Sequence, residues 1–203
     1  MRVFEIKTVR LLLLMWVLGS LTVALQAYVG HSTLYSKELQ DRREELHHAI
    51  LSNKPPGGGS WDDVGASSLN IRIGAVYLAE AVHRVTGLDL STVYLLIDTV
   101  FLFAAVLALF FYLRKWLPDT YCVIGVLYFC SVLPLTYFLH HFHPEDRIQL
   151  ATWILLLYLT RERRPLLLGA CLAVSVAIKF DTLVLPALYF LAHARLENPP
   201  VSE

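Results

Sequence analysis

Apolar runs alternate with short polar segments along most of the chain, and one long polar interval interrupts them. The runs predict helices that could cross a membrane at about residues 11–29, 90–113, 121–139 and 148–160. Two shorter apolar stretches, 166–178 and 182–194, are separated by Lys179-Phe180-Asp181. They form either a shallow hairpin that dips into the membrane or one long helix with charges at its middle. We favour the hairpin, because its turn keeps Lys179 and Asp181 away from lipid.

The long polar interval, residues 30–88, contains two helical patterns of its own. Apolar residues recur at helical spacing from Tyr35 to Ile50 and again from Ile71 to Val85. A Pro-Pro-Gly-Gly-Gly segment at residues 55–59 separates the two patterns, and Gly87 ends the second. The interval is therefore typical of two amphipathic helices that rest on a membrane surface, or of a small soluble hairpin between spans. We favour the membrane surface.

Composition places the chain in the membrane class. Hydrophobic residues make up 56% of its 203 residues, and its mean hydropathy is positive. The predicted fold class is an all-α, polytopic membrane helical bundle that forms one domain, with the two amphipathic helices in its first extracytoplasmic loop. The formal net charge is zero, so nothing indicates a nucleic-acid partner. The three cysteines lie in apolar runs, which is typical of small buried side chains.

The basic clusters predict the orientation of the chain. They lie before the first apolar run, after the second and after the fourth, positions that share the cytoplasmic side if the runs alternate across a membrane. Residues 30–88 and the loop His140–Arg147 then share the extracytoplasmic side, where one site could draw on both. Residues 24–27 faintly resemble a signal-peptidase site, but the length of the first run favours a retained transmembrane helix.

Three segments carry a resemblance to a known family: Arg42–Pro56, Asn70–Trp116 and Leu166–Leu191. They resemble the N-terminal membrane module of the polytopic C-type glycosyltransferases, which use polyprenyl-phosphate-linked sugars outside the cytoplasm. The resemblance implies a minimal or truncated glycosyltransferase module in the bacterial cytoplasmic (inner) membrane, serving polysaccharide or glycolipid biosynthesis. Its implied partners are the lipid bilayer, a polyprenyl-phosphate carrier and a further membrane subunit.

The chain departs from that family in two ways. Members usually have an acidic residue directly after the first span, where this sequence reads His31-Ser32-Thr33-Leu34-Tyr35. Members are also usually much longer. These departures leave an alternative open, namely a non-catalytic membrane subunit or scaffold that is derived from the module and acts within a larger complex.

Inverting transfer from a polyprenyl-phosphate sugar needs a carboxylate base and cations for the departing phosphate. The expected bases are Asp41, Glu38 and Asp146. The expected phosphate ligands are Arg42, Arg43, Arg72, Arg147 and Lys179. For the Asp41–Glu45 segment, a solvated helix face with i,i+4 ion pairs is the competing interpretation. Asp98 lies well inside an apolar run, so we expect it to be either a buried partner of an Arg or Lys or protonated and hydrogen-bonded.

Histidines gather in both predicted extracytoplasmic segments. His140, His143 and Glu145 are weak candidates for ligands of a divalent metal, and His47-His48 lies in the other segment. No spacing among them is diagnostic, so the sequence predicts no certain cofactor. The alternative use of the second loop is hydrogen bonding to sugar or phosphate by Asp146 and Arg147.

Overall fold

The computed structural model describes residues 2–30, 37–55, 73–137 and 145–178, together with Val184 and Tyr189. These residues form seven helices and no strand. The helices are α1 (Arg2–Gly30), α2 (Lys37–Ser52), α3 (Ile73–Thr86), α4 (Leu90–Leu113), α5 (Asp119–Tyr137), α6 (Glu145–Arg161) and α7 (Pro165–Ile178). The all-helical prediction is therefore confirmed for the described part of the chain.

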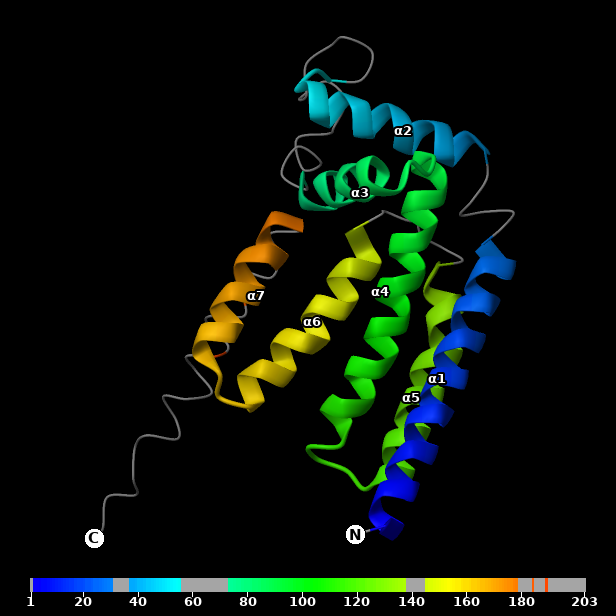
Figure 1. Ribbon diagram of the computed structural model, residues 1–203, viewed down its shortest axis with the longest axis vertical. Helices are drawn as coiled ribbons and strands as arrows, with labels where there is room; N and C mark the ends of the chain where they lie inside the picture. The colour runs from blue at the N-terminus through cyan, green and yellow to red at the C-terminus, as the bar shows by residue number, and fades with distance from the viewer. Residues whose placement is uncertain are drawn as a thin grey trace, which may run out of the picture.

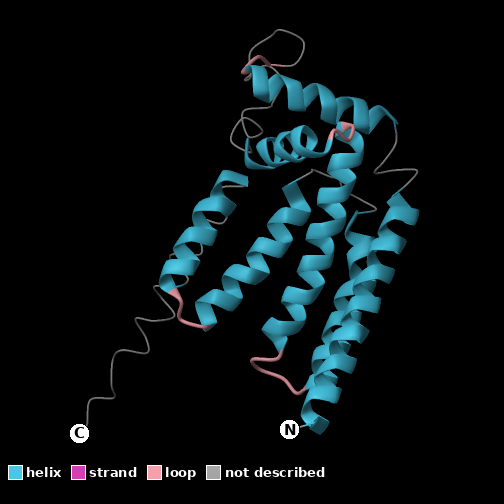
Figure 2. Cartoon of the chain, in the orientation of Figure 1, coloured by secondary structure: helices cyan, strands magenta, loops and turns pink. Residues whose placement is uncertain are grey.

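The helices form two layers (Figure 1). α1, α4, α5, α6 and α7 run upright beside one another, and α2 and α3 lie across one end of them. We call α2 and α3 the cap. The opposite end, which we call the base, holds the start of α1 and the two connections α4–α5 and α6–α7 (Figure 2). The three basic clusters thus lie at the base, the same end of the bundle, which is consistent with the orientation predicted from the sequence.

A tight corner between α3 and α4 turns the chain from the cap into the bundle. Gly87 ends α3 with φ of 71°, a conformation that glycine adopts without strain. Asp89 then caps α4, since its Oδ2 accepts a hydrogen bond from the Thr92 backbone N–H at 2.9 Å. The corner places the buried face of α3 directly over the start of α4.

α4 is the central helix of the molecule and contacts α1, α2, α3, α5 and α6. Near the cap, one apolar cluster joins α3, α4, α6 and α7 through Ala75, Ala79, Val93, Tyr94, Ile97, Ile148 and Ile178. Toward the base, a second cluster joins α1, α4 and α5 through Met15, Val106, Phe110, Cys122 and Val126. Wherever these side chains would otherwise contact water, burial of their apolar surface is the main driving force for helix packing.

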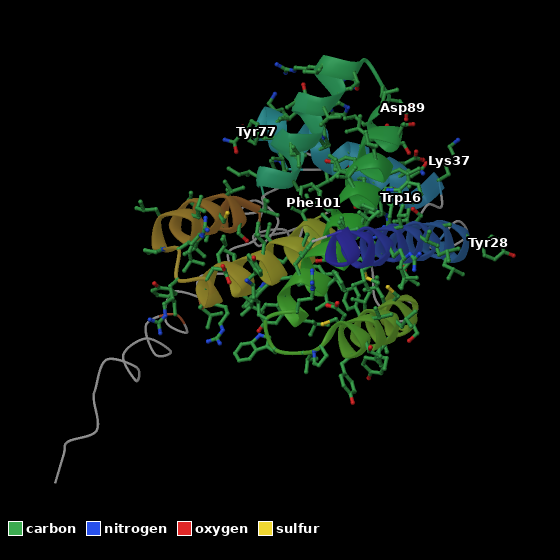
Figure 3. All side chains as sticks on the ribbon, turned by 60° about the horizontal axis from the view of Figure 1, so that its bottom comes forward. Trp16, Tyr28, Lys37, Tyr77, Asp89 and Phe101 are labelled. Atoms are coloured by element: carbon green, nitrogen blue, oxygen red, sulfur yellow. The ribbon has the colours of Figure 1, made fainter. Side chains whose placement is uncertain are left out.

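Among the described residues, α4 is the one helix long and apolar enough to cross a membrane. Shorter apolar stretches lie in α1 (Val9–Leu25), α5 (Asp119–Leu133) and α7. Large apolar side chains point outward from these helices. On α1, for example, Trp16 is 60% exposed and Tyr28 is 83% exposed (Figure 3).

The predicted helix limits agree closely with the structure in the bundle. Residues 90–113 coincide with α4, while α5 and α6 begin slightly earlier than predicted, at Asp119 and Glu145. α1 begins at Arg2 rather than near residue 11, because the basic residues before the apolar run continue the helix. The predicted stretch 182–194 lies outside the described residues except for Val184 and Tyr189, and so does the turn at Lys179.

The two cap helices also occur where the sequence predicted them, with one error in their apolar faces. Ile50 and Ala75 are buried as predicted. Val85, which the pattern assigned to the apolar face of α3, is 86% exposed. It belongs to the last turn of α3, so the buried face of that helix stops short of its end.

Candidate functional site at the junction of cap and bundle

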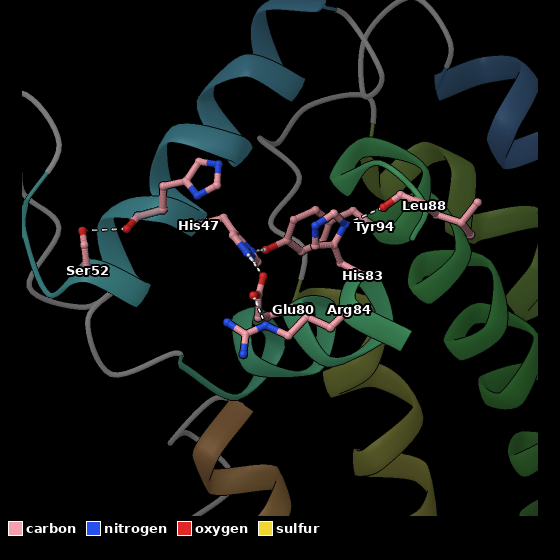
Figure 4. A network of polar contacts seen from close by, with 8 residues as sticks. His47, Ser52, Glu80, His83, Arg84, Leu88 and Tyr94 are labelled. Atoms are coloured by element: carbon pink, nitrogen blue, oxygen red, sulfur yellow. Dashed lines mark hydrogen bonds and ion pairs between the residues drawn. The ribbon is translucent and has the colours of Figure 1, made fainter. Parts of the chain in front are cut away.

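His47 is the most deeply placed polar side chain of the cap (Figure 4). It lies on the inner face of α2 and is fully buried. Its Nδ1 lies 2.9 Å from the hydroxyl of Tyr94 on α4, and its Nε2 lies 3.1 Å from Oε2 of Glu80 on α3. One imidazole therefore joins three helices.

The partners of His47 fix its tautomer. An ionised carboxylate can only accept hydrogen bonds, so Nε2 carries the proton and donates it to Glu80. Nδ1 then has no proton and accepts a hydrogen bond from the Tyr94 hydroxyl. The result is a carboxylate–imidazole–phenol chain that crosses from α3 through α2 to α4.

The electrostatics of this chain favour neutral His47 beside ionised Glu80. Burial lowers the pKa of His47 below its usual 6.5, against the opposing effect of the Glu80 carboxylate. Hydrogen bonds from His47 and from Arg84 lower the pKa of Glu80 below its usual 4.5. Arg84 lies on the exposed side of Glu80 and donates to its Oε1 from one turn further along α3.

A second polar link joins the cap to the bundle. Arg43, one turn before His47 on α2, places Nη1 at 3.9 Å from Oδ2 of Asp98 on α4. The Arg43 side chain is 10% exposed and that of Asp98 is fully buried. The structure therefore selects the first of the two alternatives for Asp98, a buried carboxylate whose charge faces an arginine.

The first turn of α6 brings further polar groups to the same end of the bundle. Arg147 is 1% exposed and is among the largest fully buried side chains. It directly precedes Ile148, which packs in the apolar cluster beneath the cap. Asp146 is half-buried beside it. An arginine this deeply buried has its charge compensated by surrounding protein groups and not by bulk water.

The predicted site residues differ in burial, and several of them lie outside the described part of the chain. Arg43 and Arg147 are held inside, whereas Asp41 and Arg42 are exposed on the outer face of α2, turned away from the face that holds His47. The side chains of Glu38 and Glu145 lie outside the described part. So do Arg72, Lys179, His140 and His143 in their entirety. Within the described ranges, no group of three or more His, Cys, Asp or Glu side chains is placed to hold a metal ion.

Sequence reasoning missed the role of Glu80 and Tyr94 and considered His47 only as part of a histidine cluster. One signal was present in the second apolar run, where Tyr94 and Asp98 lie four residues apart and so share a helix face. A polar pair on one face of such a run indicates a partner on a neighbouring element. Nothing in the spacing indicates that α2 supplies both partners.

Comparisons with known proteins leave the family open. No family model matches the chain, and no curated protein or solved structure matches it either.

Proposed function

We propose that the chain is a multi-pass membrane module of the lipid-linked-sugar glycosyltransferase type, embedded in a bacterial cytoplasmic membrane with its cap on the extracytoplasmic side. The observation that carries the proposal is the junction beneath the cap. Two amphipathic helices close one end of an apolar bundle, and two arginines, Arg43 and Arg147, are buried at that end. Cations beside apolar helices suit a ligand that combines phosphate with a long hydrocarbon chain.

Membrane insertion of the whole bundle is part of the proposal. α4 has the length and composition of a spanning helix. α1, α5 and α7 have shorter apolar stretches, and many of their large apolar side chains face outward, where lipid would cover them. Arg114 and Lys115 directly follow α4 and Arg161 ends α6, so these basic residues belong to the connections at the base, which supports a cytoplasmic base under the positive-inside rule.

The chemistry of the proposed transfer assigns roles to the described residues. A carboxylate removes the proton of the acceptor hydroxyl, whose oxygen bonds to the anomeric carbon as the bond from that carbon to the phosphate oxygen breaks. Arg43 and Arg147 stabilise the negative charge that develops on the departing polyprenyl phosphate. Asp146 is the favoured base, because it lies beside Arg147 at the edge of the core, whereas Asp41 faces outward.

The outward position of Asp41 favours a second candidate function. If neither Asp41 nor Asp146 acts as a base, the positive charges of Arg43 and Arg147 beneath the cap still favour binding of a polyprenyl-phosphate carrier. The chain would then be a non-catalytic subunit that presents the carrier to an enzyme in a larger complex. Both candidates require carrier binding, and only the first requires turnover.

Carrier binding is tested by native mass spectrometry of the purified chain with polyprenyl phosphate, in detergent with zwitterionic lipid. The double variant Arg43→Gln/Asp98→Asn removes the cation without leaving a lone buried carboxylate, and we expect it to lose most of the binding. Arg42→Gln changes the neighbouring arginine on the outer face and should bind as the wild type does. Undetectable binding by the wild type, or equal binding by the double variant, would contradict the proposal.

Turnover then separates the two candidate functions. A radiolabelled polyprenyl-phosphate sugar, incubated with membranes that contain the chain, should yield labelled acceptor if the chain is an enzyme. Asp146→Asn should abolish that label while carrier binding persists. Carrier binding without transfer in the wild type, in the presence of its natural partners, would assign the scaffold function instead.

The orientation has its own test in intact cells. In a background without the native cysteines, we expect a cysteine that replaces Lys54 in the cap to react with an impermeant thiol reagent. A cysteine that replaces Glu162 at the base should not react until the cells are opened. Labelling of the Glu162 position from outside would overturn the proposed topology.

A further inference from the structure

Two connections at the base are joined into one surface, which we call the base patch. It consists of Lys115–Leu117 after α4 and of residues 161–167, which run from the end of α6 into the first turn of α7. Lys115 Nζ lies 2.7 Å from Oε1 of Glu162, and the guanidinium of Arg161 lies 4.4 Å from the centre of the Trp116 ring. These contacts hold the end of α6 against the end of α4.

The charges of the base patch do not balance. Lys115 is neutralised by Glu162, but Arg161, Arg163 and Arg164 form no ion pair with any acidic side chain of the described residues. All three of these arginines are exposed. Arg163 has φ of 54° and lies in the short turn between α6 and α7, so the three arginines fall within four consecutive residues. The patch therefore presents concentrated positive charge.

Large apolar side chains lie directly beside this charge. Trp116 is 56% exposed, Leu117 42%, Leu166 89% and Leu167 49%. Exposed leucine and tryptophan next to arginine match the headgroup layer of a membrane, where apolar side chains enter the acyl region and cations stay at the phosphates. A soluble acidic partner would need the cations but would gain less from the four exposed apolar side chains of the two connections.

We propose that the base patch is a binding site for the headgroup of an anionic phospholipid. Arg163 and Arg164 contact the phosphodiester, because the planar guanidinium can donate two hydrogen bonds to phosphate oxygens. Trp116 and Leu166 pack against the first part of the acyl chains. The inference requires that the chain lies in a bilayer, but it is independent of what the cap binds.

The test compares lipids retained by the full chain in native mass spectrometry. The protein is equilibrated with equal amounts of phosphatidylglycerol and phosphatidylethanolamine that carry identical acyl chains, so that the two lipids differ only in the headgroup and its net charge. The wild type should retain phosphatidylglycerol preferentially. The variant Arg163→Gln/Arg164→Gln should reduce that preference about tenfold or more, since each basic side chain near an anionic surface contributes roughly fivefold.

Two controls make the result specific. Lys37→Gln/Lys54→Gln removes the same number of exposed cations at the cap and should leave the preference unchanged. Inorganic phosphate at millimolar concentration should not displace the lipid, because it lacks the acyl chains that Trp116 and Leu166 contact. Thermal unfolding of each variant verifies that it is folded.

The inference fails if the wild type shows no preference for the anionic lipid, or if the base variant retains it as well as the wild type does. It also fails if inorganic phosphate competes fully, which would indicate a simple anion site. Polyprenyl phosphate binding at the cap is measured on the same preparations. Loss of that binding in Arg43→Gln/Asp98→Asn alone, or of phosphatidylglycerol in Arg163→Gln/Arg164→Gln alone, separates the two proposals.

Discussion

The two ends of this molecule place their charged and titratable side chains in opposite environments. At the junction of cap and bundle, His47 and Asp98 are fully buried and Arg43 is nearly so, and each has a polar partner on a helix other than its own. At the base, Lys115 and Glu162 are paired at 2.7 Å but each remains partly exposed to solvent. Burying a charge has a large desolvation cost, whereas an exposed pair costs little and stabilises little. Among the described residues, the costly arrangement is found where the cap meets the bundle, which is why the candidate site is assigned to that junction.

The buried pair of the cap should give the largest effect on stability. Arg43→Ala leaves the Asp98 carboxylate buried without its arginine, and we expect a loss of about 3 kcal/mol in the free energy of unfolding. Arg43→Ala/Asp98→Asn should recover most of that loss, because no charge is then left behind. Thermal unfolding in detergent measures both variants. Equal loss in the single and double variants would indicate that the charges do not act as a pair.

The sequence predicted the helices well but not this junction, for a physical reason. Helix positions follow from local spacing, so α4 was predicted to the residue and both cap helices within a few residues. The junction depends on pairs distant in sequence, such as His47 with Tyr94, which no local pattern specifies. Asp98 was flagged by its place in an apolar run, but its partner could not be identified.

Within the candidate site, the sequence likewise could not predict which individual side chains point into the bundle. Asp41, Arg42 and Arg43 are consecutive, and the sequence predicts all three as site residues, Asp41 as a base and the two arginines as phosphate ligands. Successive residues of an α-helix point about 100° apart, so one docking of α2 turns Arg43 inward and leaves Asp41 and Arg42 outside. Which of the three side chains contacts the bundle depends on which face of α2 packs against α4, and the local sequence of α2 does not specify that face.

Two glycines at helix contacts test how tightly the two ends of the molecule are packed, with a smaller expected effect on stability. A Cβ on Gly74 in α3 would lie 2.7 Å from the backbone oxygen of Ala177 in α7, so Gly74→Ala must push two helices apart. A Cβ on Gly125 in α5 would meet only the flexible end of Leu113, at 2.8 Å. We expect Gly74→Ala to destabilise by about 1–3 kcal/mol and Gly125→Ala to change stability little.

Thermal unfolding measures the stability of both variants. Because both replace glycine by alanine, a difference between them reports only on the surroundings of the added methyl group. Gly169→Ala on α7 is the control, since a Cβ there meets nothing within 4 Å. It should be neutral or slightly stabilising, as alanine is the better helix former. A larger loss for Gly125→Ala than for Gly74→Ala would show that the cap does not pack rigidly against α7.

Acid should loosen the cap before it affects the base. The pKa of His47 is lowered in the folded state, so below its usual 6.5 the unfolded chain binds more protons and stability falls as pH falls. The pKa of Glu80 is also lowered, so its contribution is lost as pH falls through and below 4.5. The other titratable or charged groups that act on this pair are His48 on α2 and His83 and Arg84 on α3. Arg43, one turn before His47 on α2, faces Asp98 on α4.

Hydrogen exchange of the α2 amides measures this effect. Protection should fall between pH 7.5 and pH 5.5 in the wild type. His47→Gln should remove most of the pH dependence, because a glutamine amide can donate to Glu80 and accept from Tyr94 without titrating. His48→Gln changes the exposed neighbour and should keep the wild-type response. Unchanged protection of wild-type α2 across this range would contradict the assignment of His47 as the titrating group.

The ion pair at the base should give the smallest effect. The hydrogen bond between Lys115 and Glu162 raises the pKa of the lysine and lowers that of the glutamate, so both are charged at neutral pH. Because water screens both groups, Lys115→Gln should change the thermal midpoint little, and added salt should leave the wild-type midpoint nearly unchanged. The matched change at the cap, Arg43→Gln, should lower the midpoint markedly. If Lys115→Gln lowers it as much as Arg43→Gln does, exposure does not govern the strength of these pairs, and the contrast between cap and base is wrong.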